Sequence, residues 1–177
     1  MVLTKEELIA SLRNEVRILL HLATKIDQSK LDYRPTPTQR STLDLLRYMA
    51  IMAPTQIATI KEGIFTREAM VAAWGPAEAA SKTMNFDEAI AAIAKQREDL
   101  GKILSDLTEA DLREELDMFG HKQTRGYLLV NQVLCAFAAY RTQLFCYLKS
   151  CGREELNTIN LWMGTDGSMR PPRATQR

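Results

Sequence analysis

The sequence is poor in the residues from which metal centres and disulfide frameworks are built. It has two histidines, His21 and His121, which lie far apart and have no second histidine or cysteine nearby. We interpret each as an isolated histidine rather than a ligand. The three cysteines, Cys135, Cys146 and Cys151, lie near the C-terminal end with no C-x-x-C spacing. An odd number of thiols in this arrangement argues against a disulfide framework and favours a reducing, cytoplasmic compartment.

An excess of charge of one sign is also missing. The 23 Lys and Arg residues against 22 Asp and Glu residues give a formal net charge of +1, so nucleic acid and membrane are not expected partners. We interpret a small basic cluster near the C-terminus as a frayed tail; it is formed by Arg170, Arg173 and Arg177. The N-terminus has no apolar region typical of a signal peptide.

Long apolar runs and the motifs of common enzyme classes are absent as well. Asn131, Gln132 and Arg141 interrupt the most apolar stretch, which is shorter than the ~18 residues of a membrane span. No P-loop, dinucleotide-binding, zinc-protease or nucleophile-elbow motif is found. No strand pattern is convincing and no internal repeat is seen. The sequence therefore predicts a helical protein whose chemistry no common motif identifies.

Four segments have the three- and four-residue apolar spacing of amphipathic helices. Proline-containing or irregular connections separate them, including 108–123, 28–40 and 63–85; in the last of these we expect at most a short helix over 66–73 and a turn at Trp74 to Pro76. A single domain of 1–177 follows, with its core in 4–152 and an irregular C-terminal extension in 153–177. We predict an all-α, up-down four-helix bundle with long connections. The predicted helices run from Thr4 to Asp27, Ser41 to Ile60, Asn85 to Leu107 and Thr124 to Gly152.

The ends of the last predicted helix are well marked. Thr124 can accept a hydrogen bond from an amide of the first turn, and Gly152 suits the left-handed position after the helix. In the second helix, Pro54 lacks an N–H group, so a kink near Ala50 to Pro54 is expected.

Two segments of the chain resemble the DinB-like superfamily, whose fold is shared with YfiT-type and bacillithiol transferase proteins. The run Tyr140-Arg141-Thr142-Gln143-Leu144, followed by Tyr147-Leu148-Lys149 and Gly152, is similar to the signature H-R-G-Q-L…Y-L-R…G. The run Tyr33-Arg34-Pro35-Thr36-Pro37, followed by Ser41 to Leu46, is similar to a second family segment. The resemblance covers most of 4–152 and implies a four-helix bundle that holds nickel or zinc with three histidines.

The positions of those three histidines hold other residues in this chain. The resemblance places them at Tyr48, Ala136 and Tyr140. Alanine has no ligand atom, and a phenol must lose a proton with a pKa of about 10 before it binds a metal well. We therefore expect no metal and no cofactor, and a pocket in which phenols form hydrogen bonds instead.

Three further residues are predicted to line that pocket: Met52, Gln56 and Arg97. Arg97 interrupts the apolar stripe of the third helix, and two interpretations stand for it. It lies at the edge of the stripe with its guanidinium in water, the interpretation we favour, or it points into the interior and binds an anion.

Two functions are compatible with these patterns. The first is a binding or structural module without metal that takes a small-molecule ligand or forms a homodimer. Apolar residues after the last helix would then pack across a two-fold axis or back onto their own bundle: Leu156, Ile159, Leu161, Trp162 and Met163. The alternative is an enzyme that transfers a low-molecular-weight thiol in a stress response, as the resemblance implies.

Overall fold

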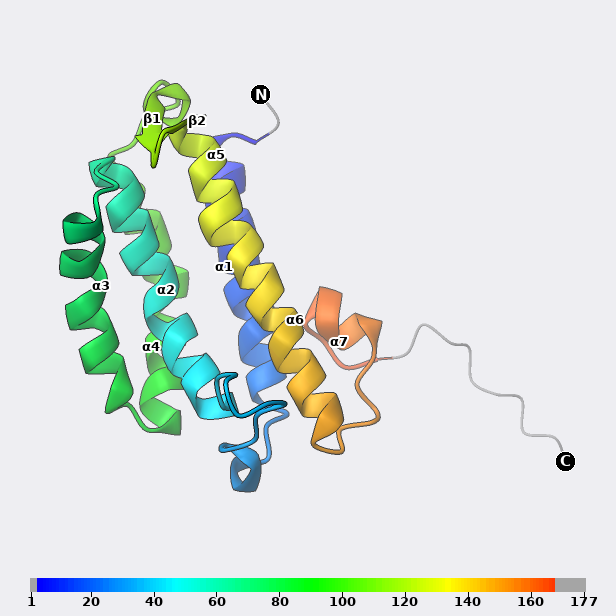
Figure 1. The fold of residues 1–177 in the computed structure, drawn as a ribbon. Coiled ribbons are helices and arrows are strands. Elements are labelled where there is room, and N and C mark those ends of the chain that lie inside the picture. Colours follow the sequence, from blue (N-terminus) through cyan, green and yellow to red (C-terminus); the bar gives the residue numbers. More distant parts are fainter. Residues whose placement is uncertain (1–2, 168–177) are drawn as a thin grey trace, which may run out of the picture.

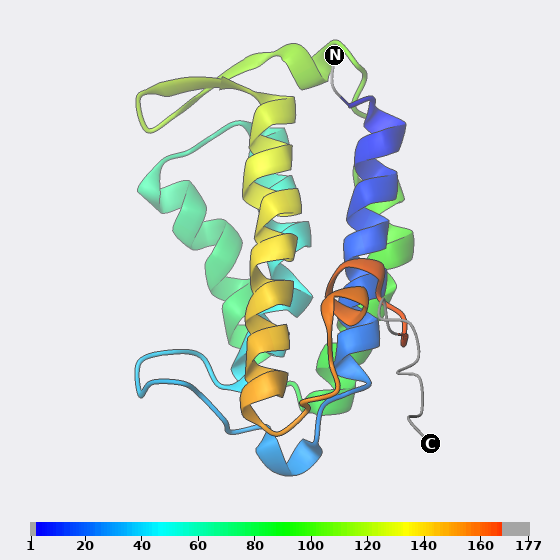
Figure 2. The same cartoon turned by 90° about the vertical axis from the view of Figure 1, so that its right-hand side faces the viewer.

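Four long helical segments form the bundle of the computed structural model, which describes residues 3–167 (Figures 1 and 2). The basic tail at Arg170, Arg173 and Arg177 lies outside these residues. The helix α4 packs against both α1 and α2, and the last segment packs against α1 and α2 as well. The four segments are α1 (Lys5–Ala23), α2 (Thr42–Glu62), α4 (Phe86–Ile103) and a final one made of α5 (Arg125–Leu129), a π-helical turn (Val130–Leu134) and α6 (Cys135–Ser150).

The helices begin where the sequence predicts. The side chains of Thr4, Ser41, Asn85 and Thr124 each accept a hydrogen bond from a backbone N–H in the first turn of the helix that follows. Gly152 has a φ of 93° and follows Cys151, the C-cap of α6. These predictions hold because capping depends on neighbouring residues, which the sequence shows directly.

The interpretation of 63–85 as largely irregular is wrong. A continuous helix, α3 (Arg67–Lys82), runs through Trp74, Gly75 and Pro76 and packs against α2 (Figure 1). The less exposed positions of α3 include Met70, Trp74, Ala77 and Ser81, which share one helical face. Packing of this face against α2 outweighs the hydrogen bond lost at Pro76, so the turn signal is overridden.

The interpretation of 108–123 as a loop also needs correction. After a 3₁₀ turn (Asp111–Arg113), β1 (Glu115–Met118) pairs antiparallel with β2 (His121–Thr124). Phe119 and Gly120 connect the strands with φ angles of 54° and 84°, the two positive values of a type I′ turn. The strands are short and mostly polar, which removes the apolar alternation by which a strand is predicted.

The C-terminal extension contains a short helix, α7 (Thr158–Met163), which lies against α1 and α6 (Figure 2). Leu156 is buried, whereas Trp162 and Met163 are 59% and 61% exposed. Part of the extension thus packs back onto its own bundle. The structure contains no helix in 3–167 that is long and apolar enough to cross a membrane.

The helix α2 continues through Pro54, and a side chain of α4 supplies the missing hydrogen bond. Without an N–H at Pro54, the carbonyl of Ala50 has no partner four residues ahead. The buried Gln96 donates from Nε2 to the carbonyl oxygens of Met49 and Ala50, both at 2.9 Å. Gln96 therefore joins α4 to α2 at the position where a kink is expected.

Replacement of Gln96 by leucine should lower the free energy of unfolding by about 1 to 2 kcal/mol. Two hydrogen bonds to carbonyls disappear, and this outweighs the removal of the Gln96 Oε1 atom, which has no partner within 3–167. Urea denaturation measures the change. In a Pro54→Ala background the effect should shrink, because residue 54 then offers its own N–H to Ala50. An equal loss in both backgrounds would contradict this role.

Candidate functional site

Two phenols meet between α2 and α6. The ring centroids of Tyr48 and Tyr140 lie 5.0 Å apart with an interplanar angle of 65°, an edge-to-face contact. Ala136 lies four residues before Tyr140, on the same face of the last helical segment. All three residues are partly buried against the core. The structure therefore brings together the two phenols that the resemblance places at metal-ligand positions.

Two residues that the sequence did not single out complete the cluster around Tyr48. Trp74 of α3 stacks on Tyr48 with centroids 6.0 Å apart and an interplanar angle of 17°. The guanidinium carbon of Arg40, in the connection before α2, lies 4.0 Å from the centroid of the Tyr48 ring, a cation–π contact. We call Tyr48, Tyr140, Trp74 and Arg40 the aromatic cluster.

The connection that carries Arg40 is fixed to α6. The Tyr147 hydroxyl donates to the carbonyl oxygen of Arg40 at 3.0 Å and accepts from Gln143 Nε2 at 2.5 Å. The Tyr33 ring lies edge-on to Tyr147 with centroids 5.6 Å apart. These contacts hold the backbone at Arg40 in place, so the Arg40 side chain starts from a fixed point near Tyr48.

The phenol of Tyr48 is held in its neutral form. Burial raises its pKa above the ordinary value of about 10, and the Tyr140 phenol adds to the increase, whereas Arg40 opposes it. Ala136 offers no ligand atom, and residues 3–167 contain no group of three or more His, Cys, Asp or Glu that could hold a metal. This donor set does not fit the nickel or zinc that the fold family implies.

The raised pKa predicts a loss of stability in alkali. Between about pH 10 and the higher pKa in the folded state, the unfolded chain releases the Tyr48 proton and the folded chain keeps it, so stability falls as the pH rises. The slope is at most about 1.4 kcal/mol per pH unit, and the solvent contact that Tyr48 retains reduces it.

Denaturation curves at several pH values above 9, with wild type and Tyr48→Phe, measure this contribution. The variant should lose less stability per pH unit than wild type. Tyr127→Phe, at a half-exposed position, is the matched control and should follow wild type. Identical slopes for wild type and Tyr48→Phe would contradict the assignment.

A pocket opens beside Tyr48, between the connection before α2, α2 itself and α3. Its volume is about 400 Å³. Asp44 lies 3.2 Å from Arg47 and 3.7 Å from Arg34, and Arg47 Nε donates to the Met84 carbonyl at 2.7 Å. The residues that line this basic pocket include Arg34, Arg40, Asp44, Arg47, Tyr48, Ile51, Glu78 and Lys82.

None of the three further residues predicted for the site lines the basic pocket. Met52 and Gln56 follow Tyr48 at steps of four on α2 and are buried, at 2% and 6% exposure; neither lines the basic pocket. Arg97 is exposed, as in the interpretation we favour, and the prediction that it enters the interior site is wrong. The buried positions of α4 are Ala89, Ile93, Gln96 and Leu100, which leaves Arg97 at the edge.

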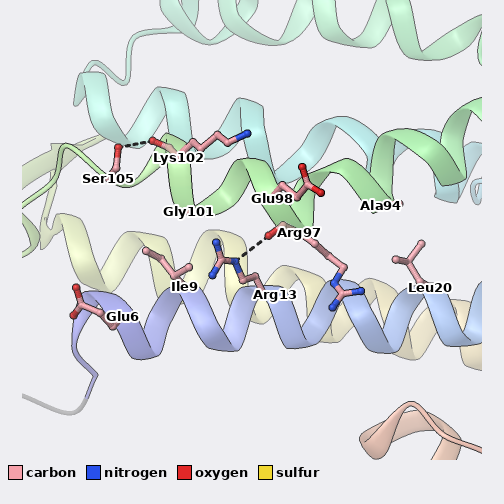
Figure 3. A pocket seen from close by; sticks show the side chains of 10 residues that line it. All are labelled: Glu6, Ile9, Arg13, Leu20, Ala94, Arg97, Glu98, Gly101, Lys102 and Ser105. Atoms are coloured by element: carbon pink, nitrogen blue, oxygen red, sulfur yellow. Dashed lines mark hydrogen bonds between the residues drawn. The ribbon is translucent and has the colours of Figure 1, made fainter.

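Arg97 lines a wider groove between α1 and α4 (Figure 3). Arg13 of α1 also points into it, and Arg13 Nε donates to the Arg97 carbonyl at 2.9 Å. A Cβ atom at Gly101 would lie 2.4 Å from an Arg13 nitrogen, so glycine leaves room for this side chain. The groove is separate from the aromatic cluster, since the two share no lining residue.

The sequence contains a local signal for each of the two site residues that the sequence analysis did not single out. Arg40 directly precedes the N-cap Ser41, which fixes it at the start of α2. Trp74 follows Met70 by four residues, a helical spacing that the neighbouring Gly75 and Pro76 obscured. Neither signal indicates contact with Tyr48, because that contact depends on how α3 packs against α2.

Comparisons with known proteins agree with the fold. The model of the DinB superfamily matches residues 11–134. The crystal structure of a DinB-like protein (YjoA) from Bacillus subtilis is 23% identical and has a TM-score of 0.63; the match covers 85% of this chain and 94% of that one. No curated protein matches. The predicted all-α four-helix bundle is confirmed, and the chain belongs to the DinB superfamily.

Proposed function

We propose that this chain is a small-molecule-binding member of the DinB superfamily that works without a metal. The observation that carries the proposal is the aromatic cluster, in which Tyr48 and Tyr140 touch at the positions where the resemblance places metal ligands. Trp74 and Arg40 cover the same Tyr48 ring. Alanine at 136 and a neutral phenol at 48 remove the donors that a nickel or zinc enzyme of this kind requires.

The surroundings of the cluster support a binding role. Ligand sites in helical bundles lie between facing helices and combine apolar or aromatic walls with a few polar groups. Here α2, α3 and α6 supply the aromatic side chains, and Tyr48 and Arg40 also line the adjacent pocket of about 400 Å³. The π-helical turn at Val130–Leu134 precedes Ala136, and such turns are frequent at functional sites.

The fluorescence of Trp74 tests the proposal directly. In a Trp162→Phe background Trp74 is the sole tryptophan, because the sequence has two. We expect small organic compounds from a diverse panel to change its emission saturably, and Tyr140→Ala to weaken or abolish this change. A panel that leaves the emission unchanged at every concentration contradicts the proposal.

Metal analysis and a turnover assay separate this function from the alternative of a thiol S-transferase. Protein purified without a histidine tag is analysed for nickel and zinc and incubated with glutathione or bacillithiol and an electrophilic acceptor. We expect metal far below one equivalent and no enzymatic turnover. Near-stoichiometric metal together with turnover would favour the alternative and overturn the proposal.

A further inference from the structure

The basic pocket beside Tyr48 carries more positive than negative charge. Its lining includes three arginines and one lysine but two carboxylates, those of Asp44 and Glu78. The whole chain has a net charge of only +1, so the excess of positive charge is a local feature of the basic pocket. Low-dielectric walls around charges of one sign concentrate their field on a ligand.

The ion pairs do not neutralise the excess. Asp44 is shared between Arg47 and Arg34. Arg47 has a further bond to the Met84 carbonyl, which fixes its orientation. Within the part of the chain that the structure describes, neither Arg40 nor Lys82 forms an ion pair. Two cations thus face the pocket without a carboxylate partner.

Arg40 is the better placed of the two. Its guanidinium carbon lies 4.0 Å from the Tyr48 centroid, and within residues 3–167 its side chain forms no ion pair, so the group rests on the ring and is available to a ligand. A guanidinium held in this way binds two oxygens of a phosphate or a carboxylate in parallel. The main chain at Arg40 is anchored by Tyr147, which reduces the entropy lost when a ligand binds.

We propose that the basic pocket binds a multiply charged oxyanion, either a phosphate group or several carboxylates of a small organic molecule. The inference rests on the proposed function and names the class of its ligand. Arg40 and Lys82 contact the charged oxygens, and Arg47 adds a third cation. The volume of about 400 Å³ lies in the lower part of the usual range for small-molecule sites.

Titration calorimetry with inorganic phosphate and with citrate, at fixed ionic strength adjusted with sodium chloride, tests the inference. Both anions are titrated into the full chain, and we expect saturable binding of at least one. Tighter binding of phosphate assigns a phosphorylated ligand, and tighter binding of citrate assigns a polycarboxylate. Arg40→Gln should weaken binding about tenfold or more, since it removes a charge-assisted contact.

Two further variants control for charge and folding. Arg97→Gln removes an exposed arginine from the separate groove between α1 and α4 and should leave the affinity unchanged. Arg40→Lys keeps the positive charge over Tyr48 but loses the planar fork, and it should also bind more weakly than wild type. Equal losses of affinity in Arg40→Gln and Arg97→Gln would show a general charge effect and overturn the inference.

Failure of the inference can be told apart from failure of the proposed function. If phosphate and citrate bind no better than chloride while neutral compounds still change Trp74 emission, the anion site is overturned and the binding module stands. If neither anions nor neutral compounds produce a response, both proposals are overturned.

Discussion

Replacement of Arg141 by methionine should lower the free energy of unfolding by about 3 to 5 kcal/mol, which is a large part of the stability of a domain of this size. Arg141 is 2% exposed and is the largest of the fully buried side chains. Its Nε donates to Glu15 Oε2 of α1 at 2.7 Å, and Nη1 donates to the Leu161 carbonyl of α7. The guanidinium also lies 5.2 Å from the Trp162 ring centroid.

The cost arises because one side chain joins three helices and neutralises a carboxylate. Without Arg141 the Glu15 side chain, 13% exposed, loses the guanidinium that lies 2.7 Å from its carboxylate. The Leu161 carbonyl loses its donor at the same time. We therefore expect α7 to detach from the bundle in this variant as well as a lower midpoint of unfolding.

Urea denaturation and the fluorescence of Trp162 in a Trp74→Phe background measure the two effects. Combining Arg141→Met with Glu15→Gln should recover part of the lost stability, because the isolated carboxylate is removed. Arg97→Met, at an exposed arginine without an ion pair in the described chain, is the control and should change stability by less than about 0.5 kcal/mol. Similar losses at both positions would contradict the role of Arg141.

A triple variant with Tyr48→His, Ala136→His and Tyr140→His should gain zinc binding in the micromolar range or tighter. The contact of Tyr48 with Tyr140, at 5.0 Å between centroids, places two of the new imidazoles close together. Position 136 is one turn from 140 on the same face, so a third imidazole can approach the same point. Three nitrogens at about 2.0 to 2.1 Å are typical of a zinc site with an open position.

Titration calorimetry with zinc and the visible spectrum of the cobalt form measure this gain. The double variant that keeps Ala136 has one ligand fewer and should bind zinc more weakly. Circular dichroism shows whether the triple variant is folded. A folded triple variant without zinc affinity would mean that the register derived from the resemblance is wrong.

Local features of the sequence predicted most of the bundle. The caps at Thr4, Ser41, Asn85 and Thr124 and the apolar spacing of the long helices depend on residues within one or two turns of each other. These interactions are present in the chain whatever its tertiary structure. The connections were predicted less well, since α3 continues through Pro76 while it packs on α2, and the hairpin at 115–124 has little apolar alternation.

The candidate site divides in the same way. The sequence by itself determined that phenols stand at positions 48 and 140, to which the resemblance assigns two of the family's histidines. The tertiary structure alone decided that these phenols touch, that Trp74 and Arg40 enclose Tyr48, and that Arg97 lies at the far groove. The physical reason is that helical spacing fixes which face a side chain occupies, whereas contacts between residues far apart in the chain depend on how the helices pack.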